Sequence, residues 1–391
     1  MNIAIVVTTY NRPNSLDRVL NSLKNAYYFN DEVPLYISID KCSDSQKAKE
    51  VLNVAQNFKW EQGPKFINEE EKNLGLKNHI LKCGKLTNIF ENIILLEDDI
   101  YVDKNFYLFA KQALTYYVND ERIAGISLYN HEVQQSTSRP FQPIYEDNDV
   151  YFLQYAQSWG QVWSKKWWSL FEQWLEKEGD TYIPSDEVPY NVNLWPLSSW
   201  LKFHIKYVIK NDKYFVYPRV SLTTNFTDSG THNHVSNTDY QVRLQYNKKN
   251  NYRFISLDES ESIYDGFFEN ITLRRFLEQK YNINSVEVDL FGVKDKKYAS
   301  NFVLTTKILK NTSIIKSYGL KLRPHELNVL LEIPGNEIFL YDLRNSENSV
   351  MKNNTFKMQL NHIKYDLKGL NKREIFIGNL YNILLFLKRR G

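Results

Sequence analysis

Cysteine is scarce in this chain, which has only two among its 391 residues, Cys42 and Cys83. A disulfide framework and a cysteine-based zinc site both need more cysteines than that. We therefore expect two reduced thiols, as is typical of a protein that works in the cytoplasm.

Strong net charge and long apolar runs are also missing. The formal net charge is +3, too small to indicate binding to nucleic acid. No apolar run approaches the roughly 20 residues that a membrane-spanning helix needs. The apolar run from Ile3 to Val7 follows Met1 and Asn2 without a basic start, so we expect no signal peptide. These absences predict a soluble cytoplasmic protein.

Aromatic residues, in contrast, are plentiful at 15%, and seven of the eight tryptophans lie between Trp159 and Trp200. Two interpretations of this cluster stay open. Tryptophans at helical spacing pack in a core, and indole rings also stack on the apolar faces of sugars. We favour Trp159, at the start of a Trp-Gly motif, for contact with a substrate. The length exceeds what one core normally holds, so we expect a large domain and a smaller one.

Strands and helices alternate four times in the first 120 residues. Apolar, β-branched runs predict strands, and leucines or other apolar residues at helical spacing predict helices between them. The expected strands span residues 3–8, 35–39, 65–67 and 92–96. This alternation is typical of an open, mostly parallel α/β sheet with helices on its faces.

Polar side chains follow three of these strands. Thr9 to Arg12 come after the first strand, Asp40 after the second, and Glu97-Asp98-Asp99 after the fourth. In such sheets the ligand binds beyond the carboxyl ends of the strands. Three strand ends converging on one edge therefore predict a binding site there.

The acidic triplet Glu97-Asp98-Asp99 carries the most chemistry. Adjacent carboxylates repel each other and are costly unless a cation lies beside them. Magnesium and manganese favour oxygen ligands and keep positions open for phosphate oxygens and water. A solvated acidic turn is the simpler alternative, but the triplet follows a buried strand. We therefore predict a site for Mn²⁺ or Mg²⁺ that neutralises a diphosphate as it leaves.

Four motifs in this order resemble those of the GT-A fold glycosyltransferases, a Rossmann-like fold. The nearest are the family 2 transferases and the Glu-Asp-Asp group that includes N-acetylglucosaminyltransferase I. Two later segments are similar to motifs of bacterial surface-polysaccharide transferases. The resemblance covers residues 1 to about 235, and the segments that carry it are Val6 to Pro13, Ser38 to Asp40, Asn73 to Leu76, Leu95 to Asp99, Trp159 to Trp163, and Tyr217 to His232.

The domain organisation follows from the resemblance and the remaining pattern. A GT-A domain spans residues 1–235, with a nucleotide-sugar half at 1–120 and an acceptor half at 121–235. Residues 236–270 are expected to form a linker or extension. Residues 271–391 are expected to form a small C-terminal α/β domain that ends in an amphipathic basic helix.

The resemblance also implies roles for individual residues. Thr9, Tyr10 and Arg12 lie against the nucleotide, and Asp40 binds the uracil edge. Asn73 and Lys77 lie near the base or the phosphates. Glu97 and Asp98 contact the ribose and the donor sugar, and Asp99 is the direct metal ligand. His232 is a candidate second metal ligand, with a loop histidine as the alternative and His234 as its competitor.

An inverting transferase needs a general base beside the acceptor hydroxyl. The similar bacterial proteins place a carboxylate after a tryptophan before the Tyr-Pro motif, but residues 195–202 contain none. Asp186 and Glu187 are the first candidates for the base, and Asp228 is next. Lost activity is the other explanation.

The last segment, residues 375–391, has an apolar face and ends in Lys388-Arg389-Arg390. It is too short to span a bilayer but suits the surface of an anionic membrane, such as the inner face of the cell membrane. A dimer contact or domain-packing helix is the alternative.

The function predicted is a metal-dependent inverting glycosyltransferase. It moves a sugar, with N-acetylglucosamine as the candidate, from a UDP-sugar to a saccharide or lipid-linked saccharide acceptor. Bacterial capsule, lipopolysaccharide or glycan assembly fits such an enzyme. One alternative is a catalytically impaired glycan-binding or scaffold protein of the same fold. A sugar nucleotidyltransferase is disfavoured, because the first loop lacks the glycines that cradle a triphosphate.

Overall fold

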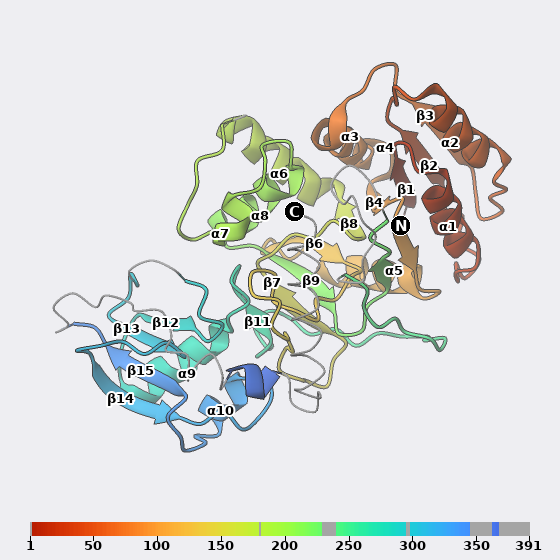
Figure 1. Ribbon diagram of the computed structural model, residues 1–391. Coiled ribbons are helices and arrows are strands. Elements are labelled where there is room, and N and C mark those ends of the chain that lie inside the picture. Colours follow the sequence, from red (N-terminus) through yellow and green to blue (C-terminus); the bar gives the residue numbers. More distant parts are fainter. Residues whose placement is uncertain (1, 180, 229–239, 295–297, 345–361, 367–391) are drawn as a thin grey trace, which may run out of the picture. The chain divides into compact units, whose positions relative to one another are not determined.

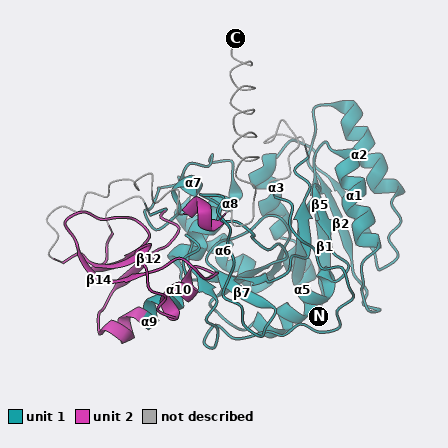
Figure 2. Ribbon diagram, turned by 60° about the horizontal axis from the view of Figure 1, so that its bottom comes forward, with its two compact units in different colours: residues 1–276, 293–296 teal, residues 277–292, 297–391 magenta. Residues whose placement is uncertain are grey.

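The computed structural model describes residues 2–179, 181–228, 240–294, 298–344 and 362–366. Two compact units divide the chain: unit 1 comprises residues 1–276 and 293–296, and unit 2 comprises residues 277–292 and 297–391 (Figure 2). The boundaries predicted from the sequence stay a prediction. Residues 240–270, expected to be a linker or extension, belong to unit 1, and Leu257 and Ile263 join its hydrophobic core.

Unit 1 holds eleven of the strands described (Figure 1). They are β1 (Ile3–Thr9), β2 (Leu35–Ile39), β3 (Lys65–Glu69), β4 (Asn92–Glu97), β5 (Ile100–Val102), β6 (Ile123–Ser127), β7 (Val150–Leu153), β8 (Gln161–Ser164), β9 (Tyr214–Pro218), β10 (Thr223–Asn225) and β11 (Ile263–Tyr264). Nine of them form one sheet in the order β11-β7-β9-β6-β8-β4-β1-β2-β3, and β10 pairs with β5.

The helices of unit 1 flank this sheet, and Figure 1 shows α1 and α2 side by side next to β1, β2 and β3. The helices are α1 (Pro13–Lys24), α2 (Ser45–Asn57), α3 (Gly75–Gly84), α4 (Thr87–Phe90), α5 (Phe106–Tyr117), α6 (Lys165–Glu178), α7 (Tyr190–Asn193) and α8 (Trp200–Lys210), while α9 (Ile271–Tyr281) begins in unit 1 and ends in unit 2.

Local sequence explains the first elements. Every residue of β1 is buried, as its unbroken apolar run predicts for a strand covered on both faces. Pro13 occupies the first turn of α1, where a missing N–H costs nothing. The carboxylate of Asp44 accepts the backbone N–H groups of Gln46 and Lys47 and so caps α2.

Strand directions decide where the polar ends meet. β1 runs parallel to β2 and β4, and β2 runs parallel to β3. β8 lies antiparallel between β4 and β6, so β6 runs in the same direction as β4, and β9 is parallel to β6. The carboxyl ends of β1, β2, β4, β6 and β9 therefore share one edge. The predicted fold class, a mostly parallel α/β sheet flanked by helices, is confirmed.

The tryptophan-rich segment forms β8, α6 and α8. Trp163, Trp167, Trp168 and Trp200 are all fully buried, and the rings of Trp163 and Trp168 lie 4.4 Å apart. For these four the core interpretation is correct.

Unit 2 contains a smaller sheet in the order β12-β13-β15-β14, which confirms the predicted α/β character of this region. Its elements are β12 (Val286–Asp289), β13 (Phe302–Thr305), β14 (Ser313–Tyr318), α10 (Glu326–Leu330) and β15 (Ile338–Asp342). The predicted terminal helix at 375–391 lies outside the described residues. Among those described, no helix has the length and apolarity needed to cross a membrane.

Candidate active site

A cavity of about 380 Å³ opens at the shared carboxyl edge of the sheet in unit 1. β1 and β4 are neighbours, with Thr8 beside Glu97 in the register, so the segments that follow them meet here. The cavity brings together most of the residues that the sequence predicts for the site. Those in its lining are Thr9, Tyr10, Arg12, Asp40, Asn73, Glu97, Asp98, Asp99 and Asp228.

A dense set of hydrogen bonds holds the acidic triplet. The Thr9 hydroxyl donates to Asp98 Oδ2 at 2.7 Å. The Arg12 guanidinium contacts Asp98 Oδ1 and donates to Asp99 Oδ2 at 3.0 Å. Asn225, on β10, donates to the other oxygen of Asp99 at 3.2 Å. Asp98 and Asp99 are 2% and 8% exposed, so these donors replace water almost entirely.

One guanidinium does not balance three carboxyl groups. Burial, followed by the charge of Asp99, raises the pKa of Glu97 to about 8, although Arg12 opposes the shift. Glu97 is therefore mostly protonated at neutral pH, and another cation beside it would favour its ionised form.

The carboxylate oxygens of the acidic triplet suit a hard divalent cation that takes few of its ligands from the protein. Among the described residues, no group of three or more His, Cys, Asp or Glu side chains is arranged to hold a metal ion. Magnesium is commonly held by one or two carboxylates, with phosphate and water oxygens completing its shell. Asp99 with its neighbours suits that mode, because the ligands are all oxygens and their charge is only partly balanced by Arg12.

Asp40 is fixed by the start of α3. Its carboxylate accepts the backbone N–H groups of Leu74 at 2.8 Å, Gly75 at 3.0 Å and Lys41 at 2.9 Å. Gly75 has a φ of +72°, a backbone conformation that glycine adopts without strain. The Asn73 amide donates to the Lys41 carbonyl at 2.8 Å. Two loops that are distant in sequence thus place Asp40 at the cavity wall with one lone pair left to bind a ligand.

His79 and Ser198, which the sequence analysis did not identify, also belong to the lining. His79 lies one turn after Gly75 on α3, and its Nε2 lies 2.8 Å from the Ser38 hydroxyl. Burial lowers the pKa of His79, which keeps the ring neutral. The helical spacing from Gly75 was the available signal, because it places His79 on the face of α3 toward the sheet.

Four predicted residues, Lys77, Asp186, Glu187 and Trp159, lie outside this lining, and two fall outside the described residues. The Lys77 ammonium lies 4.1 Å from the centre of the Phe203 ring. Asp186 and Glu187 lie in the exposed segment between α6 and α7, where Glu187 forms an ion pair with Lys210 at 2.8 Å. His232 and its competitor His234 are the two outside the described residues.

Asp228 lines the cavity but is held by partners on α1. The Ser15 hydroxyl donates to Asp228 Oδ2 at 2.7 Å, and the Arg18 guanidinium contacts the same oxygen. Burial alone would raise the pKa of Asp228, but these hydrogen bonds outweigh it and lower the pKa below its ordinary value. A carboxylate with a lowered pKa is a poor proton acceptor.

Trp159 lies outside the described cavity lining and is half-buried. Its ring centre lies 4.8 Å from that of Tyr129 and 4.6 Å from that of Tyr240. Contact between Trp159 and a substrate stays a prediction.

Neither a known protein family nor a curated protein matches this chain. Solved structures are similar to it at low identity. The mannosyltransferase PcManGT from Pyrobaculum calidifontis, in complex with GDP-Man and Mn²⁺, is 13% identical with a TM-score of 0.32, over 44% of this chain and 46% of that one. S. aureus TarS 1-349 in complex with UDP-GlcNAc is 15% identical with a TM-score of 0.39, over 59% of this chain and 60% of that one. The match thus spans less than two thirds of either structure, and likenesses this weak support no conclusion about function.

Proposed function

We propose that this chain is a metal-dependent glycosyltransferase that moves a sugar from a UDP-sugar to a saccharide acceptor. One observation carries the proposal. Three strand ends, bearing Thr9 to Arg12, Asp40 and Glu97 to Asp99, meet in a single cavity at the carboxyl edge of the sheet. The sequence resemblance to GT-A glycosyltransferases rests on these same segments.

In this proposal each wall of the cavity binds one part of the donor. Asp40, fixed by the N–H groups at the start of α3, accepts a hydrogen bond from the uracil edge. Thr9, Tyr10 and Arg12 lie against the nucleotide, with Asn73 and Lys77 toward the base or phosphates.

Glu97 and Asp98 bind the ribose and the donor sugar, and Asp99 holds the metal with His232 as a candidate second ligand. A divalent ion would supply charge to stabilise the leaving diphosphate. Arg12 already pairs with Asp98 and Asp99. Its positive charge would therefore lie beside a diphosphate bound at the metal.

An inverting mechanism needs a general base, and none of the three candidate residues combines a place in the cavity with a suitable pKa. Of the three candidates, Asp228 alone lies in the described cavity lining, and its ion pair with Arg18 lowers its pKa. Asp186 and Glu187 lie outside that lining. This observation favours a second candidate function, a glycan-binding or scaffold protein that kept the donor site without turnover.

We extend the proposal, on the resemblance alone, to N-acetylglucosamine as the sugar and to bacterial capsule, lipopolysaccharide or glycan assembly as the setting. A lipid-linked acceptor would place the protein at the inner face of the cell membrane, with residues 375–391 as the contact.

Release of UDP from UDP-GlcNAc, UDP-glucose and UDP-galactose, each with Mn²⁺, tests the proposal. We expect one donor to release UDP and Asp99→Asn to slow the release at least about 100-fold, the size of loss found when one charge-stabilising group is removed. The matched control is Asp258→Asn, because Asp258 is exposed and pairs only with Arg122 in the part of the chain described. Absence of UDP release from every donor, with saturable nucleotide binding retained, would support the scaffold instead.

A further inference from the structure

A second cavity, of about 540 Å³, lies at the same edge of the sheet in unit 1. Asn130 follows β6 and Arg219 follows β9, and both strands end on the edge where β1 and β4 end. The rest of the wall comes from the loop between β6 and β7, from Tyr151 on β7 and from Arg243. None of the catalytic roles proposed above uses this cavity.

Aromatic rings and prolines line much of the cavity. Phe141 and Tyr151 belong to the lining and are buried, with ring centres 5.9 Å apart. Pro140 and Pro143 flank them, and Tyr145 is 78% exposed. A single exposed aromatic residue is ordinary on a protein surface. Tyr145 differs because the loop that carries it is held rigidly.

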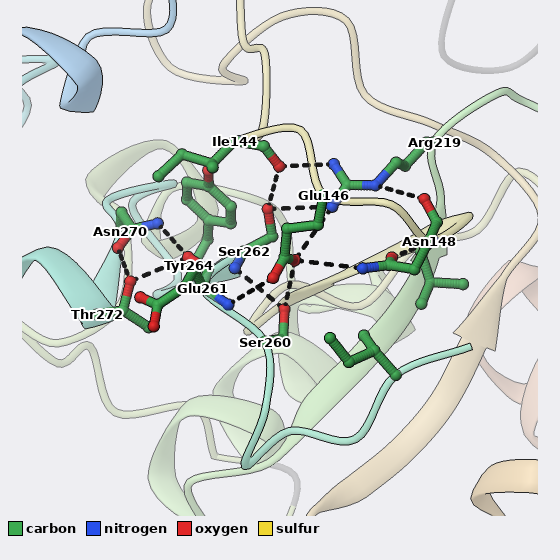
Figure 3. Close-up of polar contacts among 12 residues, drawn as sticks. Ile144, Glu146, Asn148, Arg219, Ser260, Glu261, Ser262, Tyr264, Asn270 and Thr272 are labelled. Atoms are coloured by element: carbon green, nitrogen blue, oxygen red, sulfur yellow. Dashed lines mark hydrogen bonds and ion pairs between the residues drawn. The ribbon is translucent and has the colours of Figure 1, made fainter. Parts of the chain in front are cut away.

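Hydrogen bonds from Arg219 hold that loop in place. Its guanidinium donates to the Ile144 carbonyl at 2.7 Å, the Asn148 carbonyl at 3.0 Å and the Glu146 carboxylate at 3.2 Å, as Figure 3 shows. Glu146 in turn accepts from the Ser260 hydroxyl at 2.8 Å and from the Glu261 N–H at 2.9 Å. Residues on both sides of Tyr145 are thus fixed, and the Arg219 guanidinium lies 5.6 Å from the centre of its ring. A ring fixed before binding loses little entropy when a ligand stacks on it.

The charges of the cavity are balanced. Arg219 pairs with Glu146, and Arg243 pairs with Glu132 at 2.7 Å. A cavity built for a phosphate or carboxylate would present cationic groups without such partners. The Gln142 side chain is exposed, and Glu132 and Arg243 lie at the wall with it. Apolar rings beside an amide and a balanced ion pair suit a neutral ligand that has apolar faces and many hydroxyls.

We propose that this second cavity binds a neutral oligosaccharide, with Tyr145 as the stacking platform and Gln142 as a hydrogen-bonding partner. The proposal rests on the proposed function for its biological meaning, because the oligosaccharide is then the part of the acceptor distant from the reacting hydroxyl. The binding itself needs neither the nucleotide nor the metal.

Saturation-transfer NMR on the full chain, without nucleotide or metal, tests the binding. The probes are N-acetylchitohexaose, cellohexaose and maltohexaose, with hyaluronan hexasaccharide as the anionic comparison. We expect at least one neutral probe to bind with a Kd below about 10 mM. Tyr145→Ala should weaken that binding at least about tenfold, a loss in the range of one aromatic contact. Gln142→Ala should weaken it less.

The matched control is Tyr246→Ala, which removes an even more exposed ring, at 94%, outside the lining of this cavity and should leave binding unchanged. The proposal is overturned if no neutral probe binds, if neither Tyr145→Ala nor Gln142→Ala weakens binding, or if the anionic probe binds more tightly than every neutral one. UDP release from the donor is measured on the same preparations. Failure of UDP release with saccharide binding intact would remove the proposed function and leave this site standing, and the reverse result would remove only this site.

Discussion

Arg12 is the internal cation of the acidic site, and its removal gives the sharpest test of how that site is held together. Arg12→Met keeps an unbranched apolar stem of similar volume to the methylenes of arginine but removes the guanidinium and its charge. It leaves two nearly buried carboxylates, with side chains that are 3% and 12% exposed, without the guanidinium that bonds both. Removing one partner of a buried ion pair lowers the free energy of unfolding by about 3–5 kcal/mol. Because one carboxyl can take up a proton instead, we expect the lower end, about 3 kcal/mol.

A divalent cation should replace the missing charge. At about 100 times its Kd, a ligand that binds only the folded state adds about 2.7 kcal/mol. In the natural chain Mn²⁺ has to compete with Arg12 for the same oxygens, so Mn²⁺ should stabilise Arg12→Met by more than it stabilises the natural chain.

Urea unfolding followed by tryptophan fluorescence measures both effects, since all eight tryptophans lie between residues 60 and 200 and so report on unit 1. Arg18→Met is the matched control, because the Arg18–Asp228 pair is about one quarter exposed on each side. The free energy of unfolding of Arg18→Met should be lower than that of the natural chain by about 1 kcal/mol. Two results would refute the reasoning: a loss in Arg12→Met no larger than in Arg18→Met, or equal stabilisation of Arg12→Met and the natural chain by Mn²⁺.

Three further predictions concern unit 1. Burial lowers the pKa of His204 to about 3, whereas unfolded histidine titrates near pH 6.5, so stability falls as the pH drops below 6.5. Between pH 7 and 5 the free energy of unfolding should fall by about 2 kcal/mol more in the natural chain than in His204→Phe. Urea titrations measure this difference, and equal pH dependence in the two proteins would mean that the His204 ring is already charged or hydrated. Gly84→Ala would place a methyl group 2.1 Å from the indole of buried Trp168, so the variant should lose about 2–3 kcal/mol, and an unchanged melting temperature would contradict the packing. Asp186→Ala and Glu187→Ala should each leave kcat for UDP release within about twofold, since both lie outside the described cavity lining; a loss of about 100-fold or more in either variant would restore that residue as the base.

The half of the site that we propose to bind the donor could be predicted from the sequence, because its residues follow strands that local pattern identifies. The apolar runs Ile3–Thr9 and Asn92–Glu97 form buried strands, and a parallel sheet brings their ends to one edge. The half proposed to bind the acceptor could not be predicted, because loops carry its candidate residues. Spacing alone could not show that Asp228 reaches across to Ser15 and Arg18, which precede it by 213 and 210 residues.

The sequence by itself determined the alternation of strands and helices, the acidic triplet and the scarcity of cysteine. These depend on periodicity within about ten residues and on the chemistry of single side chains. The tertiary structure alone decided that β8 enters the sheet antiparallel between β4 and β6, that Arg12 pairs with both Asp98 and Asp99, and that a second cavity forms beside Arg219. These features join segments that are tens to hundreds of residues apart, and only packing of the whole unit selects such pairings.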